Sequence, residues 1–327
     1  MNQTPDTHPL WQRLLLRRLK FLGILVALLV VVLGGSYLFA PQWLLRAYVL
    51  RQAMSAHVEK HALRVGDTTW SYYEGGQGPT LVLLHGFGVD KSVWLPLAAQ
   101  LTPQFHVVIP DLPGWGESSR VADADYGVAA QAQRLQSFLA ALGVQRFVLV
   151  GHSMGGAIAG VYAAGHPDGV AGLALLDAYG LKAEPSALDR EVQAGRDPFL
   201  YADHAAFRAA LKLAFLQPPS LPARIEDVFI SRNRHDRAFI ERTLAALRQP
   251  QNRLSLQQDL GRLTMPVLGL WCRDDRMVDP SALDSLRNGL TRAASIGSSQ
   301  LTGCGHMPMM ERPEATAQVL TGFVLGR

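Results

Sequence analysis

The chain has 327 residues, of which 48% are hydrophobic, so it is long and apolar enough to bury a substantial core and is not disordered as a whole. The positive charge is concentrated near the N-terminus. Residues 1–60 carry seven Lys or Arg against two Asp or Glu (+5), so the formal net charge of +4 leaves −1 for residues 61–327. This distribution argues against a nucleic-acid partner for the main domain. With only Cys272 and Cys304, the chain can build neither a disulfide framework nor a cysteine-based zinc site.

The first element is a run of twenty uncharged residues, 21–40 (FLGILVALLVVVLGGSYLFA), about the length that a helix needs to cross a bilayer. It predicts an uncleaved transmembrane anchor. Four basic residues precede the run: Arg13, Arg17, Arg18 and Lys20. By the positive-inside rule they predict residues 1–20 in the cytoplasm and the main domain outside it, which would be the periplasm if the protein is bacterial. A cleaved signal peptide is the main alternative, but the run is long for one and Pro41 is a poor residue after a cleavage site.

Residues 41–64 are predicted as a juxtamembrane linker that begins as a short amphipathic segment. Trp43 and Tyr48 are expected at the membrane interface, where aromatic side chains are enriched.

From Thr68 onward, short β-type runs alternate with helical segments, which predicts a mostly parallel sheet covered by helices. The expected strands are 69–73, 80–84, 106–110, 147–150, 172–176, 267–271 and roughly 295–301. The expected helices are 91–101, 128–142, 154–164, 281–290 and 313–325. We divide this part of the chain into a core, residues 65–180 and 261–327, and an insertion, residues 181–260.

The insertion shows no strand signals. Apolar residues recur at helical spacing in 203–215 and 239–247, with prolines between these segments. An all-helical insertion at this position is typical of a cap over the strand ends, although helices that only pack on the sheet would show the same pattern.

A glycine-flanked serine follows the strand at 147–150. The residues GHSMG (151–155) have the G-x-S-x-G spacing of a nucleophile elbow, the tight turn that exposes a reactive serine between a strand and a helix. A side chain in place of Gly151 or Gly155 would collide with the neighbouring strand or helix. We therefore predict that Ser153 is a nucleophile.

A nucleophilic serine needs a base that takes its proton and an acid that orients the base. His306 lies in a glycine-containing loop after the last expected strand, which makes it the candidate base. Three residues compete for the role of the acid, because Asp274 and Asp275 follow one expected strand and Asp177 follows another. The order serine, aspartate, histidine is the one expected for a serine nucleophile on a parallel sheet.

The negative charge that develops on a substrate oxygen needs hydrogen-bond donors. The segment LLHGFG (83–88) runs from an apolar strand into a glycine-containing turn. We expect the backbone N–H of Phe87, after Gly86, and that of Met154, after the predicted nucleophile, to form the oxyanion hole. Neither a metal nor an organic cofactor is expected.

The motifs together resemble the α/β-hydrolase superfamily over residues 65–325. They are LVLLHGFG (81–88), DLPGWGES (111–118), VGHSMGG (150–156), WCRDDRMVDP (271–280) and GCGHMPMMERP (303–313). The N-terminal anchor, the segment from Lys91 to Trp94 and the run 151–167 are most similar to membrane-anchored monoacylglycerol lipases and related bacterial lipases and esterases. The resemblance implies an α/β-hydrolase fold with a helical cap inserted before the acid-bearing strand.

The resemblance also favours one of the three acids. In the family motif the acid is the fourth position of G-x-x-D, which is Asp275 here. The first position of that motif is commonly glycine and is Cys272 in this chain. Because Cys272 and Cys304 would lie at the ends of neighbouring strands, an extracytoplasmic location would permit a disulfide between them, which we state as a hypothesis.

Together, the site and the anchor predict a membrane-anchored serine hydrolase that cleaves carboxylic esters, of acylglycerols or other lipids, through an acyl-enzyme. The dehalogenases and epoxide hydrolases of this fold carry aspartate at the elbow, so Ser153 argues against them. Two alternatives stay open. One is a C–C bond hydrolase of ring-cleavage products, in which Arg232, Arg234 and Arg237 would bind a carboxylate. The other is a non-catalytic binding module. The sequence carries no signal for the oligomeric state.

Overall fold

Eight strands form one sheet within residues 10–326, the part of the chain that the computed structural model describes. The strands are β1 (Val58–Val65), β2 (Thr68–Gly75), β3 (Thr80–Leu84), β4 (His106–Pro110), β5 (Phe147–His152), β6 (Val170–Leu176), β7 (Val267–Cys272) and β8 (Ile296–Leu301). Their order is β1-β2-β4-β3-β5-β6-β7-β8. The pairs β1–β2 and β2–β4 are antiparallel and all other neighbours are parallel, so the predicted mostly parallel sheet is confirmed.

Strand β1 corrects the prediction for residues 41–64. We expected a linker up to residue 64, whereas the sheet already begins at Val58, and β1 pairs with β2 along its whole length. As an edge strand, β1 leaves Glu59, Lys60 and His61 exposed, so no alternation of apolar and polar residues marks it in the sequence.

Helices cover both faces of the sheet. They are η1 (Lys91–Trp94), α3 (Leu95–Leu101), α4 (Val128–Leu142), α5 (Met154–Gly165), η2 (Pro167–Gly169), α12 (Ala282–Gly289), α13 (Pro308–Glu311) and α14 (Pro313–Leu325). Successive side chains of a strand point to opposite faces, and β5 accordingly supplies Leu149 to one apolar cluster and Val148 and Val150 to another. The first cluster includes buried residues of α4, α5 and α12, and the second includes those of α3 and α14.

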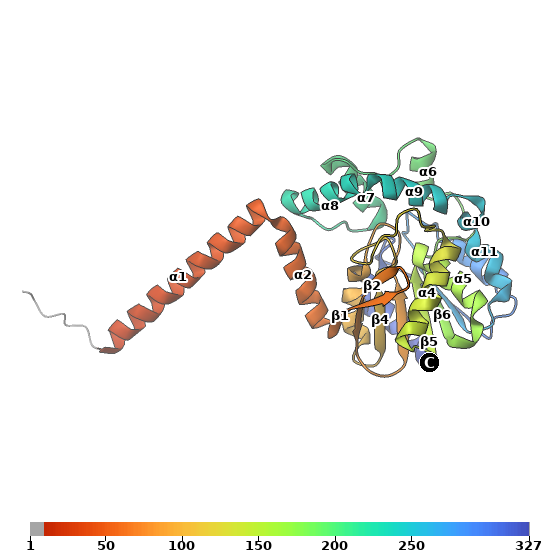
Figure 1. Cartoon of the computed structure of the whole chain (residues 1–327), viewed down its shortest axis with the longest axis horizontal. Helices are drawn as coiled ribbons and strands as arrows, with labels where there is room; N and C mark the ends of the chain where they lie inside the picture. The colour runs from red at the N-terminus through yellow and green to blue at the C-terminus, as the bar shows by residue number, and fades with distance from the viewer. Residues whose placement is uncertain (1–9, 327) are drawn as a thin grey trace, which may run out of the picture.

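The insertion between β6 and β7 is helical. It contains α6 (Ala187–Gln193), α7 (His204–Ala214), α8 (Ala223–His235), α9 (Arg237–Leu247), α10 (Pro250–Arg253), α11 (Ser255–Asp259) and η3 (Leu260–Arg262). Figure 1 shows α7, α8 and α9 lying across one end of the sheet. The sequence predicted α7 and α9 but not α8, because charged residues interrupt the apolar positions of α8, of which Ile225 and Ile230 are buried.

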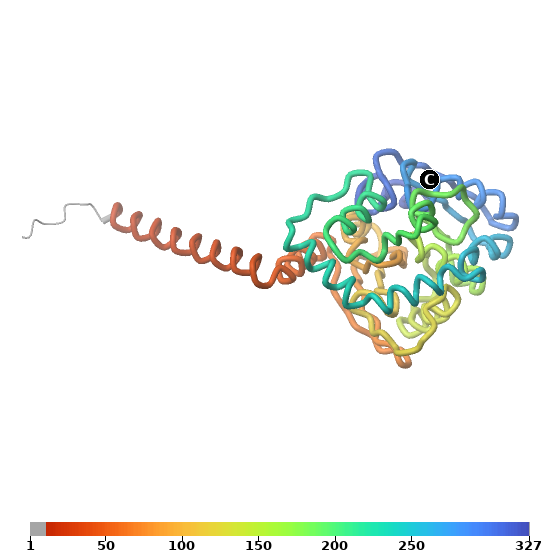
Figure 2. Tube along the Cα trace, turned by 90° about the horizontal axis from the view of Figure 1, so that it is seen from above, coloured from red at the N-terminus to blue at the C-terminus, as the bar shows by residue number. Residues whose placement is uncertain are grey.

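One long helix projects from the domain (Figures 1 and 2). This helix, α1 (Leu10–Phe39), contains a segment, Trp11–Phe39, that is long and apolar enough to cross a membrane, and no part of its apolar window is buried in the protein. It includes nearly all of the predicted span 21–40. Residues 1–9 of the predicted cytoplasmic N-terminus lie outside the described residues. The next helix, α2 (Pro41–Ser55), packs against β1, α3 and α8.

A buried ion pair joins the segments that follow β3 and β4. The Nζ of Lys91 donates to Asp111 Oδ2 at 2.5 Å and to Glu117 Oε2 at 2.7 Å, and the Lys91 backbone N–H donates to Asp111 Oδ1 at 2.7 Å. Lys91 is 3% exposed and Asp111 is fully buried. The pair therefore fixes the start of η1, a few residues after the turn that carries Phe87.

We predict that Lys91→Met lowers the free energy of unfolding by about 3–5 kcal/mol, because it leaves the Asp111 carboxylate buried without a cation. Lys60→Met is the matched control, since Lys60 pairs with Glu117 at the exposed end of the same network and should cost less than about 1 kcal/mol. Urea midpoints of the three proteins measure the difference. Equal, small losses for the two variants would contradict a structural role for the buried pair.

Candidate active site

Ser153 alone forms the turn between β5 and α5. Its backbone has φ 52° and ψ −120°, in the left-handed half of the map that residues other than glycine rarely occupy. A Cβ atom at Gly151 would lie 2.4 Å from the carbonyl oxygen of Gly155, and one at Gly155 would lie 2.4 Å from that of Leu84. Both positions therefore require glycine, and the turn stays tight enough to raise the serine above the sheet edge.

The histidine and one aspartate form a buried hydrogen-bonded pair. Nδ1 of His306 lies 2.8 Å from Asp275 Oδ2, and the side chain of Asp275 is fully buried. The other carboxylate oxygen, Oδ1, accepts from the backbone N–H groups of Met277 at 2.7 Å and Val278 at 3.1 Å. These two amides fix the carboxylate, so that an imidazole which donates Nδ1–H to it presents Nε2 as a proton acceptor.

The other two candidate acids have different surroundings. Asp274 is exposed to solvent. Asp177 is fully buried; its Oδ1 accepts from the backbone N–H of Cys272 at 2.9 Å, and its Oδ2 has no hydrogen-bond partner among residues 10–326. Burial, reinforced by the charge of Asp275, raises the pKa of Asp177 well above its ordinary value. Burial therefore favours the protonated form of Asp177, which lies near enough to Asp275 for the two carboxyl groups to interact.

One contact links the elbow to the histidine loop, and another places Ser153 against the turn that carries Phe87. His152 Nε2 donates to the carbonyl oxygen of His306 at 2.7 Å, and burial and the neighbouring His306 lower the pKa of His152, which stays neutral. A Cβ atom at Gly86 would lie 3.0 Å from Ser153 Cβ, so the turn that carries Phe87 lies against the serine. Met154 opens α5, where backbone N–H groups have no acceptor within the helix.

The hypothesised disulfide is present in the structure. Cys272 and Cys304 are bonded, with their Cα atoms 5.4 Å apart. Cys272 ends β7 three residues before Asp275, and Cys304 lies two residues before His306. The disulfide therefore ties together the two loops that supply the hydrogen-bonded pair.

Sequence reasoning missed Glu311, which joins the histidine loop to the insertion. Its Oε1 accepts from the N–H groups of Leu216 at 2.9 Å and Gln217 at 3.1 Å, just after α7, and its Oε2 accepts from Gly305 at 2.7 Å. Glu311 lies in the motif 303–313, but no spacing in the sequence distinguishes it from a surface glutamate.

Aromatic side chains of the insertion pack against aromatic side chains of the core beside the site. The rings of Phe87 and Phe199 lie 5.0 Å apart, and those of Phe87 and Trp115 lie 4.7 Å apart. Phe239 of α9 lies 5.2 Å from Trp115. Because Phe87 and Trp115 follow the carboxyl ends of β3 and β4, the insertion covers the end of the sheet at which Ser153 lies.

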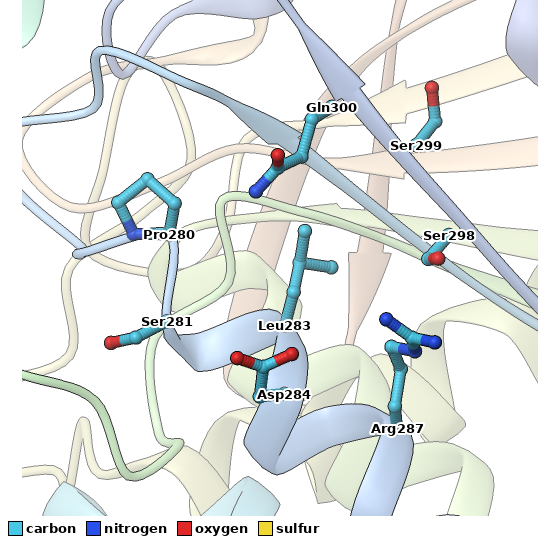
Figure 3. A pocket seen from close by; sticks show the side chains of 8 residues that line it. All are labelled: Pro280, Ser281, Leu283, Asp284, Arg287, Ser298, Ser299 and Gln300. Atoms are coloured by element: carbon cyan, nitrogen blue, oxygen red, sulfur yellow. The ribbon is translucent and has the colours of Figure 1, made fainter.

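Two hollows of similar volume on the surface can be compared with the positions of the predicted site residues. Figure 3 shows a groove of about 430 Å³ between α12 and edge strand β8, lined by polar side chains such as Asp284, Arg287 and Gln300; it contains none of the predicted site residues. A second hollow of about 470 Å³ is lined by Tyr179 and Val278, among others. The backbone N–H of Tyr179 donates to the carbonyl oxygen of Ser153 at 3.0 Å, but the second hollow, like the first, is lined by none of the predicted site residues.

The arginines that a C–C hydrolase would need do not line an enclosed pocket. Arg232, Arg234 and Arg237 are all exposed, and Arg237 pairs with Glu241 at 2.9 Å. Within residues 10–326, no group of three or more His, Cys, Asp or Glu side chains is arranged to hold a metal ion.

Comparison with known proteins places this geometry in a family. The profile of the alpha/beta hydrolase fold matches residues 79–313. The chain is 29% identical to monoacylglycerol lipase ABHD6 of Bos taurus over 322 residues (92% of this chain, 93% of the relative) and 31% identical to Lipase 1 of Psychrobacter immobilis over 278 residues (84% and 86%). A crystal structure of a bacterial membrane phospholipase A superposes with a TM-score of 0.83 at 38% identity, covering 94% of this chain and 98% of that one.

We predict that Asp275→Asn lowers kcat for ester hydrolysis by roughly 10³-fold to 10⁴-fold, because an amide cannot stabilise the imidazolium. Asp177→Asn should change kcat by less than about threefold, because an amide of the same shape keeps an oxygen that accepts from the Cys272 N–H. Steady-state kinetics on a soluble ester measure both. The reverse ranking would assign the acid's role to Asp177.

The disulfide closes a long loop, since its cysteines are 32 residues apart. The double variant Cys272→Ala/Cys304→Ala should therefore lose about 3–4 kcal/mol of stability. Thiol titration of the denatured, unreduced protein should find no reactive thiol, and reduction should release both. Two thiols before reduction would contradict the pairing.

Proposed function

The chain belongs to the alpha/beta hydrolase fold family and is a carboxylic ester hydrolase, and from this premise we propose that Ser153, His306 and Asp275 hydrolyse lipid esters, in particular acylglycerols, at a membrane. The observation that carries the proposal is the buried hydrogen bond between His306 and Asp275. The carbonyl oxygen of the same histidine accepts from His152, the residue before Ser153 in its strained strand-to-helix turn.

In this mechanism, Nε2 of His306 takes the hydroxyl proton as Ser153 Oγ attacks the ester carbonyl. Asp275 accepts the Nδ1–H of the resulting imidazolium. The backbone N–H groups of Phe87 and Met154 donate to the oxyanion. His306 then protonates the departing alcohol, which leaves the acyl group on Ser153. In the second half of the reaction, His306 takes a proton from water as the water attacks the acyl carbonyl, and then returns a proton to Ser153 Oγ as the acid leaves.

The aromatic side chains beside the site are suited to bind an apolar acyl chain. Phe87 lies in the predicted oxyanion turn, and its ring contacts Phe199 of the insertion and Trp115 of the core. Aromatic rings at van der Waals contact bury apolar chains without a need for specific hydrogen bonds. We propose residues 181–260 as the cap that binds the acyl chain.

Membrane anchoring supports a lipid substrate. The apolar helix α1 is long enough for a span, and basic residues before residue 21 favour a cytoplasmic N-terminus. The disulfide between Cys272 and Cys304 fits a catalytic domain outside the cytoplasm, where disulfides persist. We therefore propose a single-pass protein whose domain faces away from the cytoplasm.

The experiment compares a short p-nitrophenyl ester with a long-chain monoacylglycerol, using the full chain in detergent. Both should be hydrolysed, and Ser153→Ala should lower kcat roughly 10⁴-fold or more. A fluorophosphonate probe should label the wild type and the control Ser137→Ala, an exposed serine on α4, but not Ser153→Ala. Absence of labelling in the wild type would favour the binding module, and hydrolysis of the soluble ester alone would refute the lipid substrate.

A further inference from the structure

Helix α2 is attached to the domain by one face. Ala53 is 4% exposed and Val49 packs beside it, in the cluster that also contains residues of α3. The helix contacts β1, α3 and, in the insertion, α8. Helix α2 is therefore part of the folded domain and is not a free tether between α1 and the sheet.

The opposite face of α2 is apolar and exposed. Trp43, Ala47, Leu50 and Met54 recur at spacings of four, three and four residues, which places them in one line along a helix, here named the α2 stripe. Trp43 is 59%, Leu50 62% and Met54 68% exposed, although side chains of this kind are usually buried. Tyr48, which we expected at the interface with Trp43, is also exposed but lies off this line on the helix.

Arginines border the α2 stripe on both sides. At 100° per residue, Arg46 and Arg51 lie on its two flanks, and both are exposed. The Arg46 guanidinium lies 5.1 Å from the centre of the Trp43 ring. Helix α2 contains no acidic residue, so the exposed face presents apolar side chains between positive charges.

The position of α2 in the chain indicates what covers this face. Only Ala40 separates α2 from α1, the helix that is long and apolar enough for a membrane span. An exposed line of apolar side chains with arginines on both flanks and an aromatic ring at its start can contact both the apolar and the charged parts of an anionic lipid surface.

We propose that the α2 stripe docks on the surface of an anionic bilayer, with Arg46 and Arg51 against lipid phosphates. This inference rests on the proposed membrane location of the protein and adds a second lipid contact to α1. Because the other face of α2 contacts α8, docking holds the helical insertion, and with it the cover of Ser153, beside the lipid surface.

The test uses the full chain in vesicles of phosphatidylcholine and phosphatidylglycerol. Both native cysteines are bonded to each other, so one introduced thiol can be labelled selectively with a fluorophore. A label at Met54→Cys should lose about half of its fluorescence or more when the vesicles contain brominated lipid, because a docked stripe places it among the lipids. Ser298→Cys, exposed on the opposite edge strand β8, should show no quenching.

Leu28→Cys in α1 separates this inference from the proposed location. Quenching at Leu28 without quenching at Met54 overturns docking but keeps the span, and quenching at Met54 without quenching at Leu28 supports docking while refuting the span. Absence of quenching at both Met54 and Leu28 refutes both the docking of the α2 stripe and the membrane span. If Met54→Cys instead escapes quenching and forms covalent dimers with a bifunctional thiol reagent, the stripe contacts a second copy and the proposal is wrong.

A functional readout uses Leu50→Asn/Met54→Asn. This variant should hydrolyse a bilayer lipid at least about fivefold more slowly and a soluble short-chain ester at the wild-type rate. Ser55→Asn, on α2 but off the stripe, is the matched control and should match the wild type on both substrates. An unchanged rate on the bilayer lipid for the double variant would contradict the proposal.

Discussion

The backbone turn at Ser153 is the constraint on which the rest of the site depends. A positive φ at a serine costs about 1–3 kcal/mol and persists only where the surroundings enforce it. Here the enforcement comes from hydrogen bonds and close packing. The N–H of Ser153 donates to the carbonyl oxygen of Leu176 in the neighbouring strand, and the carbonyl oxygen of Ser153 accepts from the N–H of Tyr179. At Gly151 and Gly155 the neighbouring backbone lies so close that a side chain would collide with it. The strain is therefore sustained by β5, α5 and β6 together.

Parallel strands explain why distant segments meet at this turn. Strands β3, β5, β6 and β7 end at the same edge of the sheet, so each following loop brings one component to it. Covalent and hydrogen-bond ties then fix the loops relative to one another. The Cys272–Cys304 disulfide joins the acid loop to the histidine loop, His152 holds the backbone of His306, and Glu311 joins that loop to the insertion. Contacts from both the core and the insertion thus support the Asp275–His306 hydrogen bond.

Motif spacing predicted most of this arrangement because local chemistry determines it. Glycines beside Ser153 and the order of Ser153, Asp275 and His306 can be recognised without coordinates, and the apolar runs of buried strands have little ambiguity. The missed features depend on tertiary context. Strand β1 is polar because it lies at an edge, and Glu311 becomes significant only when Leu216 and Gly305 lie beside it. Asp177 is one of three candidate acids in the sequence, and only the three-dimensional structure shows that the partner of His306 is Asp275.

The central claim is that Ser153 carries the acyl group of a lipid ester during turnover. The most direct measurement is the intact mass of the protein quenched in acid during steady-state hydrolysis of a monoacylglycerol, followed by peptide mapping of any adduct. The account predicts a mass increase equal to that acyl group, located on the peptide that contains Ser153 and absent from Ser153→Ala. Sustained hydrolysis with no adduct on that peptide, or with the adduct on another residue, would contradict it.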